Sequence, residues 1–301
     1  MPAPKPNLEL VEITPPAPTE LSAEQREVFK YSDEAAKRVG TDRLRPVRLG
    51  AGLIGYHYNP HGTPPPEYAA VLKHVAEAWV IVYREGTVAT FPLVPKHEFA
   101  ALIPAPSGNR FLVFSKKGPS TDDPDAEVGG GHVVEVDART LAASVAFTGT
   151  TGRSGSFLGT NARDVRTVWT ADYVDDDTIV TSISENNSTE HSIVLLGRGA
   201  DGTFAEIDRT KAPANGTILT AGAGVIAVSS GAKLVAYGVL ERKLVKLGTV
   251  AKPAKFGPVV AHPVDTREEL HFIDKAGSKH YRLTNHDLLL AATKPKKKKK
   301  A

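Results

Sequence analysis

The sequence contains no cysteine, so disulfide bonds, thiolate metal sites and a cysteine nucleophile are all excluded. The absence of cysteine also fits a reducing compartment. Long apolar runs are missing as well, because no window approaches the roughly 18 apolar residues of a membrane-spanning helix. The first residues, 1–6, lack the apolar core of a secretory signal. These features predict a cytoplasmic protein.

The body of the chain has no excess of basic residues, although the whole sequence has a formal net charge of +3. Six lysines lie in the last eight residues, which leaves 31 basic residues against 34 acidic ones in the remainder. The folded body is therefore slightly acidic, and the basic balance belongs to a tail. At 301 residues with 41% apolar content, the chain is long enough to bury one large core or two small ones.

Both ends of the chain have compositions that disfavour a packed fold. Residues 1–18 contain six prolines, each of which fixes φ and removes a backbone donor, so this arm is predicted to be extended and poorly ordered. It is either a plain disordered terminus or a proline-rich docking arm. Residues 291–301 are predicted to form a disordered lysine-rich tail, because five consecutive ammonium groups repel one another.

An amphipathic helix is predicted over residues 19–40. Ser22 and Gln25 match a capping box, apolar residues recur at helical spacing, and Gly40 can end the helix. This helix either packs on the main domain or binds a partner, since its apolar stripe is narrow. A shorter helix is predicted over residues 67–78, directly after a run of three prolines.

Most of residues 43–290 have the pattern of short strands. β-Branched and aromatic runs alternate with turn residues about every ten positions, which is typical of a meandering antiparallel sheet. Strands are predicted near 47–49 and 53–56. Hairpins are predicted for the pairs 79–83 with 87–93, 99–103 with 110–114, 132–137 with 141–147, 165–173 with 178–183, 192–196 with 203–207, 225–228 with 234–237, and 270–273 with 280–283. The fold class is therefore all-β.

Runs that follow a turn recur at similar intervals. Ile179, Val225 and Leu270 are 46 and 45 residues apart, and Phe111 lies 68 residues before Ile179, with a long acidic loop between. A period of about 40–50 residues with four short strands is what a propeller blade requires. Over residues 43–290 the chain resembles a β-propeller of the WD40-like kind, although the Trp-Asp and Gly-His signatures are absent. The resemblance implies five or six blades, with residues 46–58 completing the last one.

Several motifs resemble known sites and fail on spacing. The acidic run 123–127 lacks the Gly and Glu that a calcium loop needs, and residues 175–177 are interpreted as a turn. The glycine-rich run 149–155 has no Lys-Ser/Thr ending and no clear following helix. Ser230 and Lys233 span a hairpin turn, where a serine-lysine pair cannot act as it does at a helix start. No catalytic, cofactor-binding or metal-binding residue is therefore assigned.

The histidines form no evident ligand set. His57 and His61 have helical spacing, but Pro60 lies between them and no clear third ligand follows. Each histidine is interpreted as an ordinary surface or core residue. Strand alternation is expected to scatter the four near the C-terminus over both faces of a sheet: His262, His271, His280 and His286.

The lysine tail is the feature that points most directly to a ligand. Mobile ammonium groups bind phosphates by releasing counterions, with an affinity that falls steeply as salt rises. Nucleic acid, an anionic membrane surface and an acidic protein all fit, and the plain alternative is a solubilising tail. In a eukaryote the tail also matches a nuclear import signal. The predicted polyanion-binding residues are Lys294, Lys296, Lys297, Lys298, Lys299 and Lys300.

Three functions remain open at this point. The first is a non-enzymatic scaffold whose propeller-like body binds a protein partner while the helix and tail add contacts. The second is a propeller hydrolase or lyase with a divalent ion in the central channel, because Asp, Glu and His are plentiful. The third is a nucleic-acid-associated protein anchored by its tail. The resemblance favours the scaffold, since propellers mostly serve as rigid binding platforms, but a fold does not fix a function.

Overall fold

The protein is all-β, with antiparallel sheets and one short helix in its described part. The structure is a computed structural model that describes residues 7–14, 47–50, 53–58, 79–84, 87–92, 97–117, 127–140, 142–153, 165–185, 188–214, 216–256, 269–274 and 278–293. The chain divides into two compact units. Unit 1 holds residues 1–16, 172–182 and 190–301, and unit 2 holds residues 17–171 and 183–189.

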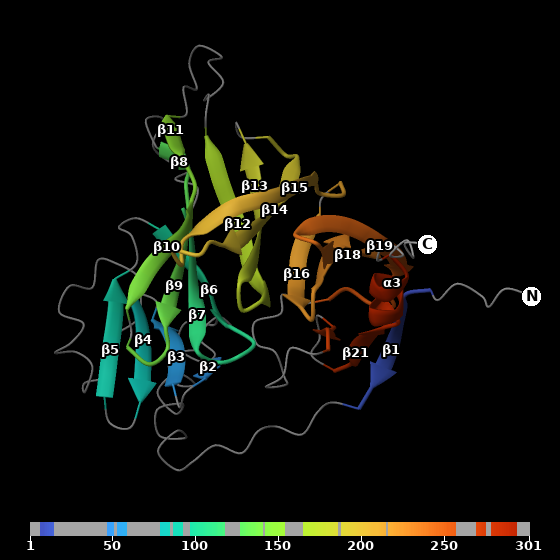
Figure 1. Cartoon of the computed structure of the whole chain (residues 1–301), viewed down its shortest axis with the longest axis horizontal. Coiled ribbons are helices and arrows are strands. Elements are labelled where there is room, and N and C mark those ends of the chain that lie inside the picture. The colour runs from blue at the N-terminus through green and yellow to red at the C-terminus, as the bar shows by residue number, and fades with distance from the viewer. Residues whose placement is uncertain are drawn as a thin grey trace, which may run out of the picture. The chain divides into compact units, whose positions relative to one another are not determined.

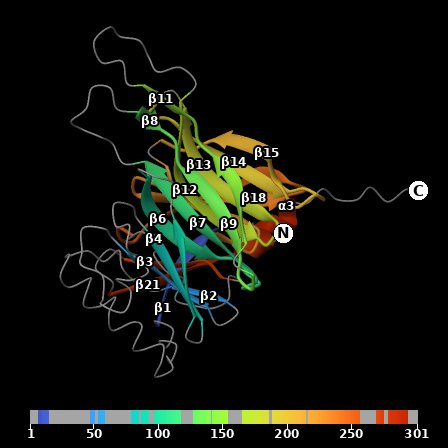
Figure 2. The same cartoon turned by 90° about the vertical axis from the view of Figure 1, so that its left-hand side faces the viewer.

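Four four-stranded antiparallel sheets follow one another along the chain (Figure 1). The first two lie in unit 2, and Figure 2 shows β6, β7 and β9 side by side in the second of them. The first contains β2 (Val47–Gly50), β3 (Leu53–Tyr58), β4 (Trp79–Arg84) and β5 (Thr87–Pro92). The second contains β6 (His97–Pro104), β7 (Arg110–Lys117), β9 (His132–Asp137) and β10 (Ala143–Thr148).

The next two sheets are plain meanders with the strand order of the chain. A separate two-stranded sheet, β8 (Glu127–Gly129) with β11 (Thr151–Arg153), precedes them. The third sheet contains β12 (Arg166–Asp175), β13 (Thr178–Glu185), β14 (His191–Arg198) and β15 (Phe204–Lys211). The fourth contains β16 (Thr217–Gly222), β17 (Val225–Ser230), β18 (Lys233–Leu240) and β19 (Lys243–Ala251).

The predicted repeat is confirmed for three of its four positions, whereas Leu270 lies directly before β20 (His271–Ile273), an end strand of a three-stranded sheet. Phe111, Ile179 and Val225 lie on β7, β13 and β17, each of which is the second strand of its sheet, and all three side chains are fully buried. The interval from Phe111 to Ile179 is longer because it also contains the two short strands β8 and β11, which have no counterpart in the described residues between Ile179 and Val225. The predicted hairpins are confirmed too, with pairs such as Arg84 opposite Thr87 and Ser230 opposite Lys233.

The fourth sheet is buried on both faces, which is the property that makes the fold propeller-like. On β17, Ile226 and Val228 pack into a core shared with β13 and β14, while Val225 and Ala227 pack into a second core on the other side. The second core is completed by residues of the C-terminal strands, including Phe272. Since successive residues of a strand point to opposite faces, both parities must be apolar, and the run Val225–Val228 satisfies this requirement.

The fifth sheet is closed by the N-terminus. It contains β20 (His271–Ile273), β21 (His280–Thr284) and β1 (Glu9–Ile13), and β1 lies beside β21 in Figure 1. An isolated bridge between Phe256 and Asp274 adds a further neighbour on the β20 side. Two predictions are wrong here. The segment 46–58 does not complete the last sheet, because its strands β2 and β3 belong to the first sheet. Residues 9–13 form a strand, although they lie in the arm that was predicted to be disordered. The arm forms a strand there because Leu8 and Leu10 pack into the second core.

The single helix in the described part, α3 (His286–Thr293), was not predicted. Asn285 precedes it with φ of +63°, and the Leu289 N–H donates to the Asn285 carbonyl at 3.1 Å. Leu289 packs on the second core, which explains why a segment of only eight residues is helical. Residues 291–293 are therefore helical, contrary to the predicted disordered tail. No described helix is long and apolar enough to cross a membrane.

Other predictions fall outside the described residues. The helices predicted over 19–40 and 67–78 are among them, as are the tail lysines. The boundaries 43 and 290 of the propeller-like domain stay a prediction.

Candidate functional site

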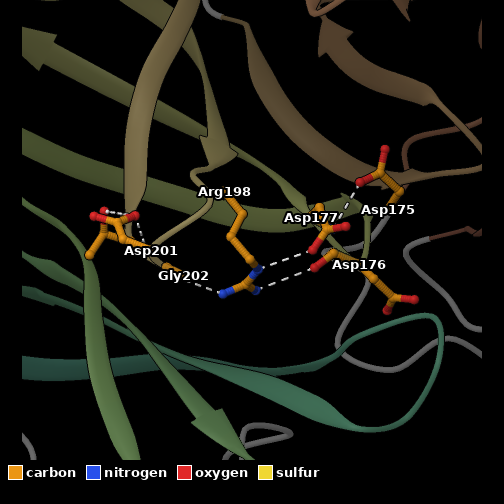
Figure 3. A network of polar contacts seen from close by, with 7 residues as sticks. Asp175, Asp176, Asp177, Arg198, Asp201 and Gly202 are labelled. Atoms are coloured by element: carbon orange, nitrogen blue, oxygen red, sulfur yellow. Dashed lines mark hydrogen bonds and ion pairs between the residues drawn. The ribbon is translucent and has the colours of Figure 1, made fainter.

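The acidic run Asp175–Asp177 forms the turn between β12 and β13, as the sequence predicted. Figure 3 shows that Arg198, from the end of β14, reaches into this turn. Its Nε lies 3.0 Å from Asp177 Oδ1, its Nη2 donates to the Asp176 carbonyl at 3.4 Å, and its Nη1 donates to the Gly202 carbonyl at 3.1 Å. One guanidinium therefore joins the turns at the same end of two neighbouring hairpins.

The Arg198 side chain has a structural role, because protein contacts fix its guanidinium and leave little of it exposed. Its side chain is only 13% exposed, and its guanidinium carbon lies 4.3 Å from the centroid of the Phe204 ring. Asp201 caps its own turn by accepting from the Thr203 N–H and hydroxyl, and those two hydrogen bonds lower the pKa of Asp201 below its usual value. The acidic turns are thus structural, because their carboxylates stabilise turn backbone.

Asp172 has a comparable role inside unit 1. Its carboxylate is buried and accepts the Tyr173 N–H at 2.8 Å and the Ala221 N–H at 2.7 Å. Ala221 belongs to β16, so this one side chain connects the third sheet to the fourth. A buried carboxylate is retained only when such hydrogen bonds compensate for its lost hydration.

The remaining sequence motifs lie apart from any common site in the described part of the chain. Ser230 ends β17 and donates its hydroxyl to the Ala214 carbonyl at 2.9 Å, while Lys233 begins β18, so the pair spans a hairpin as predicted. Gly149 is packed so tightly that a Cβ would lie 2.5 Å from the Arg166 carbonyl oxygen. This close approach explains the glycine without any phosphate. Residues 118–126 of the acidic loop lie outside the described residues.

Glu269, His271 and Arg282 form a group of three ionisable side chains in direct contact, here named the Glu269 cluster. Glu269 Oε2 lies 2.8 Å from His271 Nε2, and Glu269 Oε1 accepts from Arg282 Nη1 at 2.8 Å. The hydrogen bond from His271, followed by the hydrogen bond and charge of Arg282, lowers the pKa of Glu269. The His271 side chain is only 6% exposed, so the imidazole is the inner member of the cluster.

Strand register places two histidines on one face of the fifth sheet, which corrects the expectation that alternation would scatter them. His271 lies opposite Arg282, and Ile273 lies opposite His280, so all four side chains share one face. Residues 271 and 280 differ in parity, but the intervening turn reverses the chain and restores a common face. Glu269 and Arg282 were missed because neither belongs to a recognised spacing motif.

A second feature is β12, the terminal strand of the third sheet, whose residues Arg166 and Trp169 lie in unit 2. The backbone of Gly130 and Thr150 bridges the outer edge of β12 at Thr167 and Arg166. Trp169 is 40% exposed, and its Nε1–H donates to Ser184 Oγ at 2.8 Å. Arg166 pairs with Glu185 at 3.5 Å, and its guanidinium carbon lies 5.8 Å from the centroid of the Phe147 ring. The two residues are three positions apart, which is about 10 Å along a strand, and their side chains point to opposite faces of β12. We name this feature the β12 edge.

No group of three or more His, Asp or Glu residues is positioned to hold a metal ion among the residues that the structure describes. The side chain of His57 is not described, and His61 and His262 lie outside the described residues.

No protein-family profile matches the chain, and no curated protein is significantly similar in sequence. Solved structures with a similar fold include an acylaminoacyl peptidase from Pyrococcus horikoshii, with 10% identity and a TM-score of 0.43 over 77% of this chain and 35% of the peptidase. TolB from Acinetobacter baumannii has 12% identity and a TM-score of 0.38 over 80% of this chain and 53% of TolB.

A third similar structure is the β-propeller domain of the trilobed protease from Pyrococcus furiosus, which has an open velcro topology. It shows 9% identity and a TM-score of 0.42 over 77% of this chain and 62% of that domain. The chain thus matches only about a third of the Pyrococcus horikoshii peptidase and about half of TolB. Similarity at this level assigns no activity to the chain.

Proposed function

We propose that the chain is a non-enzymatic scaffold that binds a protein partner through its propeller-like body. The observation that carries the proposal is the β12 edge, where a large aromatic side chain is 40% exposed and yet fixed by a hydrogen bond. Trp and Arg are the residue types most enriched where interfaces gain their binding energy. A side chain that is already held in one rotamer loses little entropy when a partner covers it.

The surrounding structure suits such a role. Arg166 and Trp169 point to opposite faces of β12, because Trp169 contacts Ser184 and Arg166 contacts Glu185, the next residue of β13; Trp169 is therefore the anchor of the expected interface. The guanidinium of Arg166 is oriented by Glu185 and the Phe147 ring, so it is held on the other face. The partner expected from Trp169 presents an apolar pocket for the indole ring.

Affinity purification from the native host tests the proposal. Tagged wild-type protein, Trp169→Ala and Arg166→Glu are compared with Val145→Ala and Leu288→Ala, whose side chains are 61% and 52% exposed elsewhere. We expect one stoichiometric partner to be lost at least tenfold from Trp169→Ala and retained by both exposed controls and by Arg166→Glu on the opposite face of β12, with thermal unfolding confirming that all four variants are folded. Equal recovery of all partners by all five proteins contradicts the proposal.

The lysine tail supplies an accessory contact in this proposal. Lys294 and Lys296–Lys300 bring six positive charges to one end of the chain, which suits an acidic protein surface or a nucleic acid backbone. Binding to a duplex that engages all six has an expected slope of log affinity against log salt of about −5.

Fluorescence anisotropy with a labelled duplex and an acidic peptide tests the tail. Replacing Lys296–Lys300 with Gln should abolish binding and the salt slope, whereas replacing the exposed Lys243 and Lys246 with Gln should change neither. Binding that survives the tail replacement, with an unchanged slope, rules out the tail as the polyanion site.

A further inference from the structure

The helix α3 (His286–Thr293) is apolar on the face that points away from the fold. On its inner side, Leu289 packs on the second core and Leu290 lies against the backbone of β18. On its outer side, Leu288, Ala291 and Ala292 are spaced i, i+3 and i+4, so they share one face. All three are exposed, Leu288 by 52%. A helix that is apolar all round is normally covered on every side, so the outer face of α3 calls for an occupant.

The sequence that follows α3 supplies charge of one sign. The helix ends at Thr293, and the next residue is Lys294, followed by Pro295 and Lys296–Lys300. Six of the seven residues after the helix are therefore lysines, with no acidic residue among them. The acidic residue of α3, Asp287, lies in the first turn, at the opposite end from the lysines. An exposed apolar helix face thus adjoins a basic segment.

The apolar face decides which of the polyanions that suit lysines is favoured. A nucleic acid backbone offers negative charge but no apolar phase in which Leu288 can be buried. A face of one leucine and two alanines also lacks the aromatic and arginine anchors that are typical of protein interfaces. An anionic lipid surface suits both parts. Its headgroups attract lysines, by about fivefold in affinity for each one, and the boundary with the acyl chains accepts apolar side chains.

We propose that α3 and the lysines that follow it bind an anionic lipid surface, with Leu288 entering the boundary between the headgroups and the acyl chains. The inner side of α3 packs on β18 and β19, so the helix meets the lipid as part of the folded protein. Since the lysines are the polyanion site of the proposed function, this lipid-binding role rests on that function and names its ligand. Partner binding at Trp169, in unit 2, is a separate property.

Co-sedimentation of the full chain with vesicles of equal parts phosphatidylserine and phosphatidylcholine tests the proposal. Leu288→Gln should weaken binding about threefold to tenfold, because about half of a leucine side chain is transferred from water. Replacing Lys296–Lys300 with Gln should abolish binding. Val145→Gln, at a side chain that is 61% exposed in the second sheet, is the matched control and should bind as the wild type does. Leu288→Trp tests the same contact by a gain, because indole rings favour the membrane interface, and should bind more tightly.

The labelled duplex described above separates lipid binding from a general polyanion-binding role of the tail. Leu288→Gln should bind the duplex as the wild type does, because no apolar surface is buried there. Vesicle binding that is equal in the wild type and both Leu288 variants, but lost with the lysines, overturns the entry of Leu288 into lipid and leaves the tail as a polyanion site. Vesicle binding that survives the lysine replacement contradicts both roles. Binding to the duplex without binding to the vesicles overturns the lipid ligand alone.

Discussion

Asp172 offers the sharpest test of how the sheets of unit 1 are joined, because one carboxylate contacts two of them. Replacing it with Ala removes two hydrogen bonds to a charged acceptor, each of which contributes about 1.5–3 kcal/mol. It also leaves the Ala221 N–H without its carboxylate acceptor at a residue with no exposed surface. Relief from burying the carboxylate offsets part of this loss, so the expected net destabilisation is about 3 kcal/mol.

Thermal and urea unfolding followed by circular dichroism measure the effect. A loss of about 3 kcal/mol corresponds to a decrease in Tm of about 6–12 °C for a unit of this size. Asp172→Asn keeps one carbonyl oxygen and should fall between the wild type and Asp172→Ala. Asp175→Ala is the matched control, because Asp175 is exposed and accepts a single turn N–H, from Asp177. If Asp172→Ala unfolds together with Asp175→Ala, the buried carboxylate does not join the sheets.

Three further predictions concern the turns and the Glu269 cluster. Gly149→Ala places a Cβ against backbone oxygens and should destabilise the protein by about 2 kcal/mol more than Gly202→Ala, whose Cβ meets nothing within 4 Å and whose cost comes from its φ of +82° alone, as urea unfolding can measure. The pKa of Glu269 is lowered in the folded state, so its stabilisation is present above the unfolded value of about 4.5 and is lost as the pH falls through the folded pKa. When the free energy of unfolding is measured as the pH is lowered, the pH dependence that comes from Glu269 should therefore be missing in Glu269→Gln. The same pH dependence in the wild type and in Glu269→Gln would contradict the assignment. Arg198→Lys keeps the charge but cannot reach three acceptors, so it should cost about 1–2 kcal/mol in urea unfolding.

The strands were predictable because their signals are local. The turn at 231–232 has Gly231 at φ of +53°, and the runs on either side are apolar at both parities, as a strand buried on both faces requires. The same reasoning placed Phe111, Ile179 and Val225 at equivalent positions without any similarity of sequence between the units. Hairpin geometry depends on a few residues, so a single sequence contains enough information to predict it.

The last sheet was harder to predict because its partners are far apart in sequence. β1 pairs with β21 across more than 260 residues, as the Lys279–Glu12 ion pair at 3.0 Å illustrates. Three of the five residues of β1 are apolar, but of these Leu10, together with the preceding Leu8, contributes to the second core, while Val11 is 41% exposed. The helix α3 is similar, since its stability comes from Leu289 against a distant core and not from its own sequence. Local patterns cannot reveal elements that are stabilised by tertiary packing.

The same packing explains where this protein can carry function. On β17 and β18, alternate residues enter two different cores, so neither face of that sheet is available to a ligand. The polar side chains at the strand ends are used to hold turns, as Arg198 and Asp201 show. Among the described residues, the exposed Trp169 of β12 lies outside these two cores, and so does the Glu269 cluster, where Glu269 and Arg282 are 45% and 40% exposed. With both faces of the fourth sheet occupied by cores, an exposed side chain such as Trp169, rather than the face of that sheet, is where the proposed partner would bind.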